Sequence, residues 1–293
     1  MREKSSLFFC LASIAMICST GGFAQTLKGK IALELSADKG VYVWGENIWL
    51  DVTRVNLLDQ EVVVSGEHHI GIRVTDDSGG RVLPGWIVDY YAIRYSVSPR
   101  SSLTESFRVD HRNDTTEESP GTRLLPGAYT VWAVLGDVTS NTLQVRVIPP
   151  SAEERVVAQQ VVEKLHKWSS MTEAIQDAKN MIRQYPHTVY LPNVYLELIG
   201  KLAAADKGTA RAEELVKYSL ELIEKFPSHG DVQVALGYYV TGFLRKLGVG
   251  NRQTPSPQQW RTVETELQEI LSRHPNERMK RYVDQIVKNS QVR

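Results

Sequence analysis

The sequence predicts a chain of two domains that differ in class: an antiparallel β-sandwich over residues 25–148 and an all-α domain over residues 151–293. In the first domain, apolar residues recur at every second position, which is the period of a strand with one buried face. In the second, they recur at every third or fourth position, which is the period of a helix. Between them lie Pro149 and Pro150, which cannot continue a strand ladder, so we place the boundary there.

Residues 1–24 have the pattern of a secretory signal peptide. A positively charged start precedes the apolar run LFFCLASIAMIC at residues 7–18, and small residues lead up to Ala24. We therefore expect cleavage between Ala24 and Gln25 and an exported protein. The alternative is an N-terminal membrane anchor, but the apolar run has 12 residues, whereas a helix needs about 20 to cross a bilayer.

The mature chain would contain no cysteine, because Cys10 and Cys18 both lie inside the predicted signal peptide. This excludes disulfides, thiol catalysis and thiolate metal sites in the exported protein.

The charge of the mature chain is close to zero. The whole chain has 34 basic and 34 acidic residues, and cleavage would remove two basic residues and one acidic residue, which leaves a net charge of −1. The sequence has no stripe of basic residues, so we predict no nucleic-acid partner. No later apolar run approaches spanning length, so we expect no membrane span in the mature chain.

Five segments with alternating apolar residues account for much of the predicted sandwich, at residues 30–36, 47–55, 68–76, 127–135 and 141–148. Such runs are typical of antiparallel strands with one face in the core and one face in water. In the second segment, the core face would carry Ile48, Leu50 and Val52, and the other face Trp49, Asp51 and Thr53. Turn-forming stretches such as DDSGG and LPG separate the runs, and their spacing predicts seven to nine strands.

Two stretches of the first domain resemble bacterial Ig-like and macroglobulin-type domains. The stretch ADKGVYVWGENIWLDVTRVN at residues 37–56 is similar to the start of the second strand in that family, which reads Asp-Lys, a Tyr, then Pro-Gly-Glu. Trp44 stands where the family usually has proline. The stretch LLPGAYTVWA at residues 124–133 is similar to the start of a late strand. This resemblance implies an Ig-like sandwich and a tyrosine corner, with the Tyr129 hydroxyl bonded to nearby backbone.

Helical spacing in the second domain predicts seven helices, at about residues 151–167, 170–184, 190–204, 209–225, 231–247, 257–273 and 276–289. Ser151, Ser170 and Ser256 each stand three positions before a Glu or Gln, which is the spacing of a capping box. Pro257 would occupy a first helical position, and Gly248 would end the fifth helix.

The helical domain contains an internal echo. Three similar stretches, MIRQYPHT, LIEKFPSH and ILSRHPNE, each end a predicted helix just before Pro186, Pro227 or Pro275. The pattern resembles degenerate TPR-like repeats of exported bacterial proteins, in which a helix pair ends in Tyr-Pro or Phe-Pro. Such helices must stack on neighbours to bury their apolar faces. An irregular helical bundle is the alternative.

We predict no catalytic, cofactor-binding or metal-binding residues, and therefore no cofactor. His68 and His69 are adjacent, and adjacent strand residues point to opposite faces, so they are a poor pair of metal ligands. The segment TDDSGG at residues 75–80 carries two carboxylates. A hairpin turn explains these residues better than calcium, which needs about six or more oxygen ligands.

Tyr195 and Tyr238 are the candidate partner-binding residues. They lie on predicted helices that follow two of the repeated prolines, and in a TPR-like stack those helices would line a concave groove. Tyrosine is a frequent anchor at protein contacts. The alternative is that both rings are half-buried between helices, with the stripe of Val194, Leu198 and Leu202 forming the core beside Tyr195.

These observations favour an exported, non-enzymatic binding or scaffold protein, periplasmic or at the cell surface, whose helical repeats present a groove to a peptide or protein partner. One alternative is a hydrolase whose site lies at the junction of the domains, where pockets are common. Another is an Ig-like inhibitor or adhesin module that binds through loops at residues 65–69 or 109–122.

Overall fold

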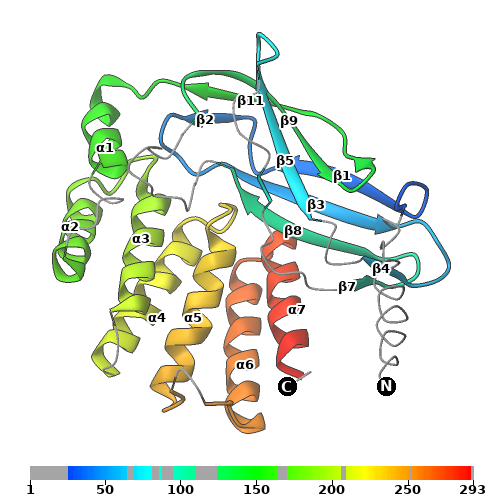
Figure 1. The fold of residues 1–293 in the computed structure, drawn as a ribbon. Coiled ribbons are helices and arrows are strands. Elements are labelled where there is room, and N and C mark those ends of the chain that lie inside the picture. Colours follow the sequence, from blue (N-terminus) through cyan, green and yellow to red (C-terminus); the bar gives the residue numbers. More distant parts are fainter. Residues whose placement is uncertain are drawn as a thin grey trace, which may run out of the picture.

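The computed structural model describes residues 26–64, 69–80, 86–87, 95–109, 124–163, 170–205, 209–250 and 253–291. A β-rich part comes first and a part of seven helices follows it (Figure 1). The predicted signal peptide, which ends at Ala24, and Gln25 after it lie outside the described residues. Most of the two predicted contact loops, at residues 65–69 and 109–122, lies outside them as well. None of the helices described is long and apolar enough to cross a membrane.

The strands form three sheets. The first has the order β1-β3-β8, the second has the order β2-β11-β9-β5-β6 with β10 paired to β9, and the third pairs β4 with β7. All pairings are antiparallel except that of β2 with β11. The strands are β1 (Ile31–Ala37), β2 (Val41–Val43), β3 (Trp49–Asn56), β4 (Val62–Val64), β5 (Ile70–Asp76), β6 (Trp86–Ile87), β7 (Tyr95–Val97), β8 (Ser102–Arg108), β9 (Gly127–Leu135), β10 (Val138–Thr139) and β11 (Leu143–Ile148).

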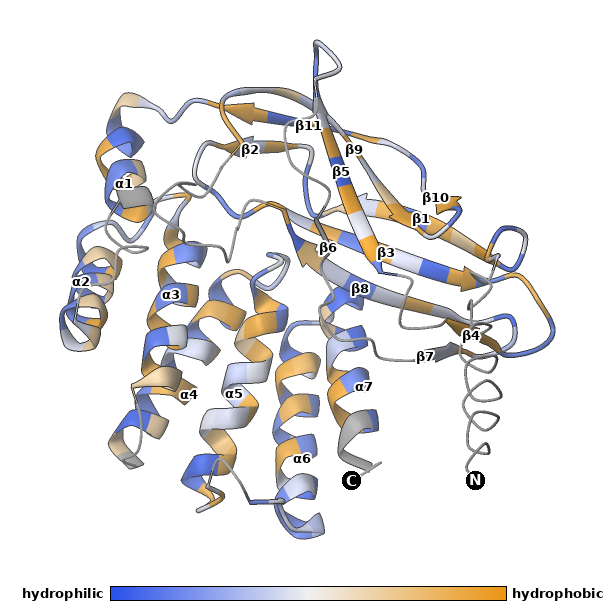
Figure 2. Cartoon of the chain, viewed as in Figure 1, coloured by the Kyte–Doolittle hydropathy of each residue, from blue (hydrophilic) through white to orange (hydrophobic). Residues whose placement is uncertain are grey.

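One apolar core lies among these sheets, and the predicted strand faces supply it. Polar and apolar residues alternate along the strands (Figure 2), and the apolar face of each points inward. Ile48, Leu50 and Val52 are buried in this core, as the alternation predicts. The other strands contribute Ile31, Leu33 and Leu35 from β1, Val131, Ala133 and Leu135 from β9, and Val145 and Val147 from β11.

Side-chain hydrogen bonds satisfy backbone groups at two places in the β part, before β9 and at the edge strand β2. The Tyr129 hydroxyl donates to the carbonyl of Leu125 over 2.6 Å, which is the bond that the tyrosine corner implies. At the edge strand β2, the backbone N–H of Val43 donates to Glu46 Oε2 at 2.5 Å, and Lys39 Nζ lies 2.7 Å from Glu46 Oε1. Glu46 thereby accepts a hydrogen bond from an N–H group that an unprotected sheet edge would offer to another chain.

The seven helices described begin and end within four residues of their predicted bounds, and two of them match at both ends. They are α1 (Ala152–Glu163), α2 (Met171–Gln184), α3 (Leu191–Ala204), α4 (Thr209–Lys225), α5 (Val232–Lys246), α6 (Pro257–Arg273) and α7 (Glu277–Gln291). Ser256 and Gln259 form the complete capping box expected of α6. At α1 only half of the box forms: Ser151 accepts from the Glu154 N–H over 3.2 Å, whereas the Glu154 carboxylate binds Thr188 and Val189 instead.

The helical part has a second apolar core, built from different residues. Val194, Leu198 and Leu202 are fully buried in it, which confirms the predicted stripe. Val43 of β2 and Trp44, in the turn that follows it, depart from this division: both pack against the helical core, and Trp44 also packs against the core of the β part.

The repeated proline turns have a common structure and lie side by side. In the first two, the second residue after the proline donates its N–H to the carbonyl of the residue before the proline: Thr188 to Tyr185 over 3.3 Å and His229 to Phe226 over 2.9 Å. The third turn is shorter, and Asn276 within it donates to the carbonyl of Pro227 over 2.9 Å. Each turn leads into a helix whose first residues face the β part: α3, α5 and α7 (Figure 1).

Candidate functional site at the junction of the two parts

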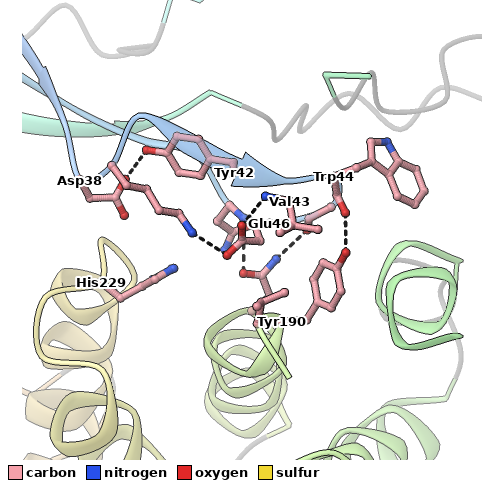
Figure 3. Close-up of polar contacts among 12 residues, drawn as sticks. Asp38, Tyr42, Val43, Trp44, Glu46, Tyr190 and His229 are labelled. Atoms are coloured by element: carbon pink, nitrogen blue, oxygen red, sulfur yellow. Dashed lines mark hydrogen bonds and ion pairs between the residues drawn. The ribbon is translucent and has the colours of Figure 1, made fainter. Parts of the chain in front are cut away.

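The helix starts of α3, α5 and α7 bind successive positions of one short β segment, residues 44–51. Figure 3 shows the contact at α3, where Tyr190 lies below Trp44. This segment contains the turn between β2 and β3 and the first residues of β3. It is also the stretch that carries the resemblance to Ig-like domains. We call this set of contacts the junction.

At α3, the contacts go to the backbone of the turn. The Tyr190 hydroxyl donates to the carbonyl of Trp44 over 2.7 Å, and Asn193 Nδ2 donates to the carbonyl of Gly45 over 2.9 Å. The N–H of Asn47 donates to Asn193 Oδ1 over 3.4 Å. Because Tyr190 and Asn193 are buried, these bonds satisfy groups that would otherwise be desolvated without partners.

At α5, the contacts converge on one carboxylate. Asp231 is fully buried and accepts hydrogen bonds from Asn47 Nδ2 at 3.0 and 3.1 Å and from Trp49 Nε1 at 2.6 Å. Asp231 stands at the N-cap position of α5, yet its side chain makes no capping bond to its own helix. Its carboxylate binds the β part instead.

Gly230 allows the Trp49 ring to approach α5 this closely. A Cβ atom at position 230 would lie 2.1 Å from Trp49 Cγ, far inside van der Waals contact. Glycine is therefore required here by space, since any side chain would displace the indole.

His229 completes the α5 side of the junction. Its Nδ1 accepts the N–H of Asp231 over 3.2 Å and lies 3.5 Å from Asp231 Oδ2. In a neutral imidazole the hydrogen is then on Nε2. That atom is buried and has no hydrogen-bond partner within the described part of the chain. Figure 3 shows the ring lying below the segment that carries Asp38 and Tyr42.

At α7, two arginines hold a single aspartate of β3. Arg278 Nε and Arg281 Nη2 each lie 3.0 Å from Asp51 Oδ2, and a second nitrogen of Arg278 lies 3.0 Å from Asp51 Oδ1. The Ser106 hydroxyl, on the neighbouring strand β8, contacts both Asp51 and the Tyr282 hydroxyl. Fork-shaped guanidinium groups suit such two-oxygen contacts.

Burial keeps the phenols around the junction uncharged. Burial chiefly, together with the nearby Asp38 carboxylate, raises the pKa of Tyr42 far above its ordinary value. Burial is also the main cause that raises the pKa of Tyr282. Both hydroxyls therefore keep their protons, and can donate hydrogen bonds, above the ordinary phenol pKa of about 10.

The junction corrects one sequence-based expectation. The outer face of β3 is predicted to lie in water, but Trp49 and Asp51 on that face are only 5% and 4% exposed, because the helix starts cover them. A strand with one wet face and a strand whose second face docks on another part of the chain have the same alternation, so periodicity does not separate them.

The structure places the two predicted partner-binding tyrosines differently. Tyr195 is fully buried, and its hydroxyl lies 2.7 Å from both Glu221 Oε2 and Lys225 Nζ on α4, so its ring is not on the surface. Tyr238 is partly exposed and packs against the helical core. Its hydroxyl is 3.8 Å from the Cβ position of Gly200 on α3. The hydroxyl of Tyr195 thus faces α4, whereas that of Tyr238 faces α3.

The residues of the junction were missed because they are about 150 to 230 positions apart in sequence. A local signal existed in two places: tryptophan and aspartate alternate with the core residues of β3, and a glycine precedes the acidic N-cap of α5. Among the residues that the structure describes, no group of three or more His, Cys, Asp or Glu side chains could hold a metal ion.

No protein-family model matches the sequence, and no curated protein matches it. Solved structures match at low TM-scores. The alkylpurine DNA glycosylase AlkC of Pseudomonas fluorescens, bound to DNA with an abasic-site analogue, is 13% identical over 41% of this chain and 31% of that chain, with a TM-score of 0.31. This chain therefore spans less than a third of that protein.

Two further structures show how varied these matches are. The CARDB domain of a Pyrococcus furiosus protein, in complex with di-metal ions, is 16% identical over 40% of this chain and 87% of that chain, with a TM-score of 0.26. A β-glucosidase of Listeria innocua is 14% identical over 41% of this chain and 16% of that chain, with a TM-score of 0.27. Similarity at this level carries no argument about this chain.

Proposed function

We propose that this is an exported, non-enzymatic binding or scaffold protein, periplasmic or at the cell surface, in which an Ig-like sandwich and TPR-like repeats form one unit that presents a partner-binding surface. The observation that carries this proposal is the junction. Three helix starts are bound by directional hydrogen bonds and ion pairs to one segment of the β part. A fixed relation between two parts is what a scaffold needs to present a surface.

The finer fold assignment belongs to the same proposal. Largely antiparallel sheets that share one core, together with the Tyr129 hydroxyl bonded to Leu125, support an Ig-like sandwich. Repeated helix–proline–helix units with equivalent turn hydrogen bonds support TPR-like stacking. An irregular bundle would give no reason for the turns to repeat or for their helices to dock on the same surface.

Tyr238 is the better of the two candidate anchors for a peptide or protein partner. It is partly exposed, whereas Tyr195 is buried. The neighbouring Gly237 is exposed as well, so this part of α5 reaches the surface. An aromatic ring held by its own core with one open side is a common form of contact residue.

A capture experiment with the full mature chain tests this proposal. The chain from Gln25 onward serves as bait for chemical crosslinking in a cell-envelope extract, together with the variants Tyr238→Ala and Tyr218→Ala. Tyr218 is a matched control, because it is also a half-buried tyrosine of the helical part. We expect a distinct crosslinked partner that Tyr238→Ala reduces at least tenfold and Tyr218→Ala does not. Equal capture by all three chains would contradict the Tyr238 surface.

The hydrolase alternative keeps one specific observation in its favour, the imidazole of His229 beside the buried carboxylate of Asp231. Against it, Asp231 and Asp51 each already accept several hydrogen bonds from junction residues, which suits docking better than proton transfer. Hydrolysis of model esters, peptides or glycosides by the mature chain, lost in His229→Ala but kept in the matched turn variant His187→Ala, would replace the scaffold proposal with the enzyme.

A further inference from the structure

We draw no further inference here: the strongest candidate, the buried imidazole of His229 in the turn before α5, whose Nε2 has no hydrogen-bond partner within the residues that the structure describes, belongs to the junction already described, and nothing in the structure shows a ligand that would occupy it.

Discussion

Over its first four residues, strand β3 is buried on both faces, and there the two faces are covered by opposite chemistry. Its inner face packs Leu50 and Val52 into an apolar core, whereas its outer face gives Trp49 and Asp51 to hydrogen bonds and ion pairs with the helices. Apolar burial stabilises in proportion to area and has no preferred direction. Hydrogen bonds and ion pairs have fixed geometry, so the outer face selects one orientation of the helices.

This difference sets what a substitution does on each face. An inner-face truncation removes contacts and leaves a cavity. An outer-face truncation leaves buried donors or charges without partners, and that penalty exceeds what the intact pair contributes.

Asp51→Ala should have the largest effect. The substitution removes the carboxylate that pairs with the Arg278 guanidinium, a side chain that is only 13% exposed. Removing one partner of a buried ion pair costs about 3 to 5 kcal/mol. Urea titration of the variant and the wild-type chain gives this loss as a difference in the free energy of unfolding. The control is Asp59→Ala, which removes the exposed partner of Arg100 and should leave stability unchanged. Equal stability of the two variants would show that the junction pair contributes nothing.

Gly230→Ala should come next, because the added Cβ would overlap the Trp49 ring. Forcing an atom into a packed site costs about 1 to 3 kcal/mol. The matched control is Gly237→Ala, seven residues on, where the Cβ position is open and alanine should stabilise the helix by about 0.5 to 1 kcal/mol. Thermal unfolding should therefore move in opposite directions for the two variants. A shift in the same direction would refute the close approach.

Asp231→Asn should cost about 1 to 3 kcal/mol, because an amide nitrogen would replace Oδ2, which now accepts from Asn47 Nδ2 over 3.1 Å. The substitution also removes the charge that strengthens the bonds of Asn47 and Trp49 to Oδ1. A double-mutant cycle with Asn47→Ala measures the coupling between the two parts. We expect the pair of changes to cost clearly less than the sum of the single changes. Asp284→Asn, on the exposed side of α7, is the control. Additive effects would mean that Asn47 and Asp231 do not interact.

The smallest effect concerns pH, and it belongs to the helical core. Burial chiefly, with a hydrogen bond to Glu221 or Glu266, raises the pKa of Tyr195 and Tyr239 well above its ordinary value of about 10. As the pH rises, the unfolded chain therefore loses these protons at a lower pH than the folded chain. The contribution of the two phenols to the free energy of unfolding is fully present below about pH 10 and is lost as the pH rises further.

Tyrosinate absorbance, followed together with far-ultraviolet circular dichroism, measures this effect. The signals of Tyr195 and Tyr239 should appear only as helicity is lost. Tyr239→Phe should make the decline of stability above about pH 10 less steep. Titration of all tyrosines near pH 10 in a chain that keeps its helicity would contradict the burial of these two phenols.

Local features of the sequence were sufficient for the elements and their inner faces. Ile31, Leu33 and Leu35 alternate, and Val194, Leu198 and Leu202 recur at helical spacing, and each set is buried as its period predicts. Ser256 and Gln259 predict the start of α6 because a capping box depends only on residues three positions apart. Each of these features depends only on residues that are close to one another in the sequence.

The junction could not be predicted in this way, because its partners are decided by tertiary packing. Asp51 is a surface residue by its local pattern and becomes buried only when α7 is folded against it. Tyr195 flanks the core stripe of α3 by sequence, and it is the neighbouring helix α4 that covers it. The three proline turns were visible as a repeat, but the surface on which they converge was not.

Differential scanning calorimetry of the wild-type chain from Gln25 onward tests the central claim most directly. If the junction unites the two parts, they unfold in one transition, with a calorimetric enthalpy equal to the van't Hoff enthalpy. Asp51→Ala should then broaden or split that transition. Two independent transitions in the wild-type chain, unaffected by Asp51→Ala, would show that the parts are not held together by the junction.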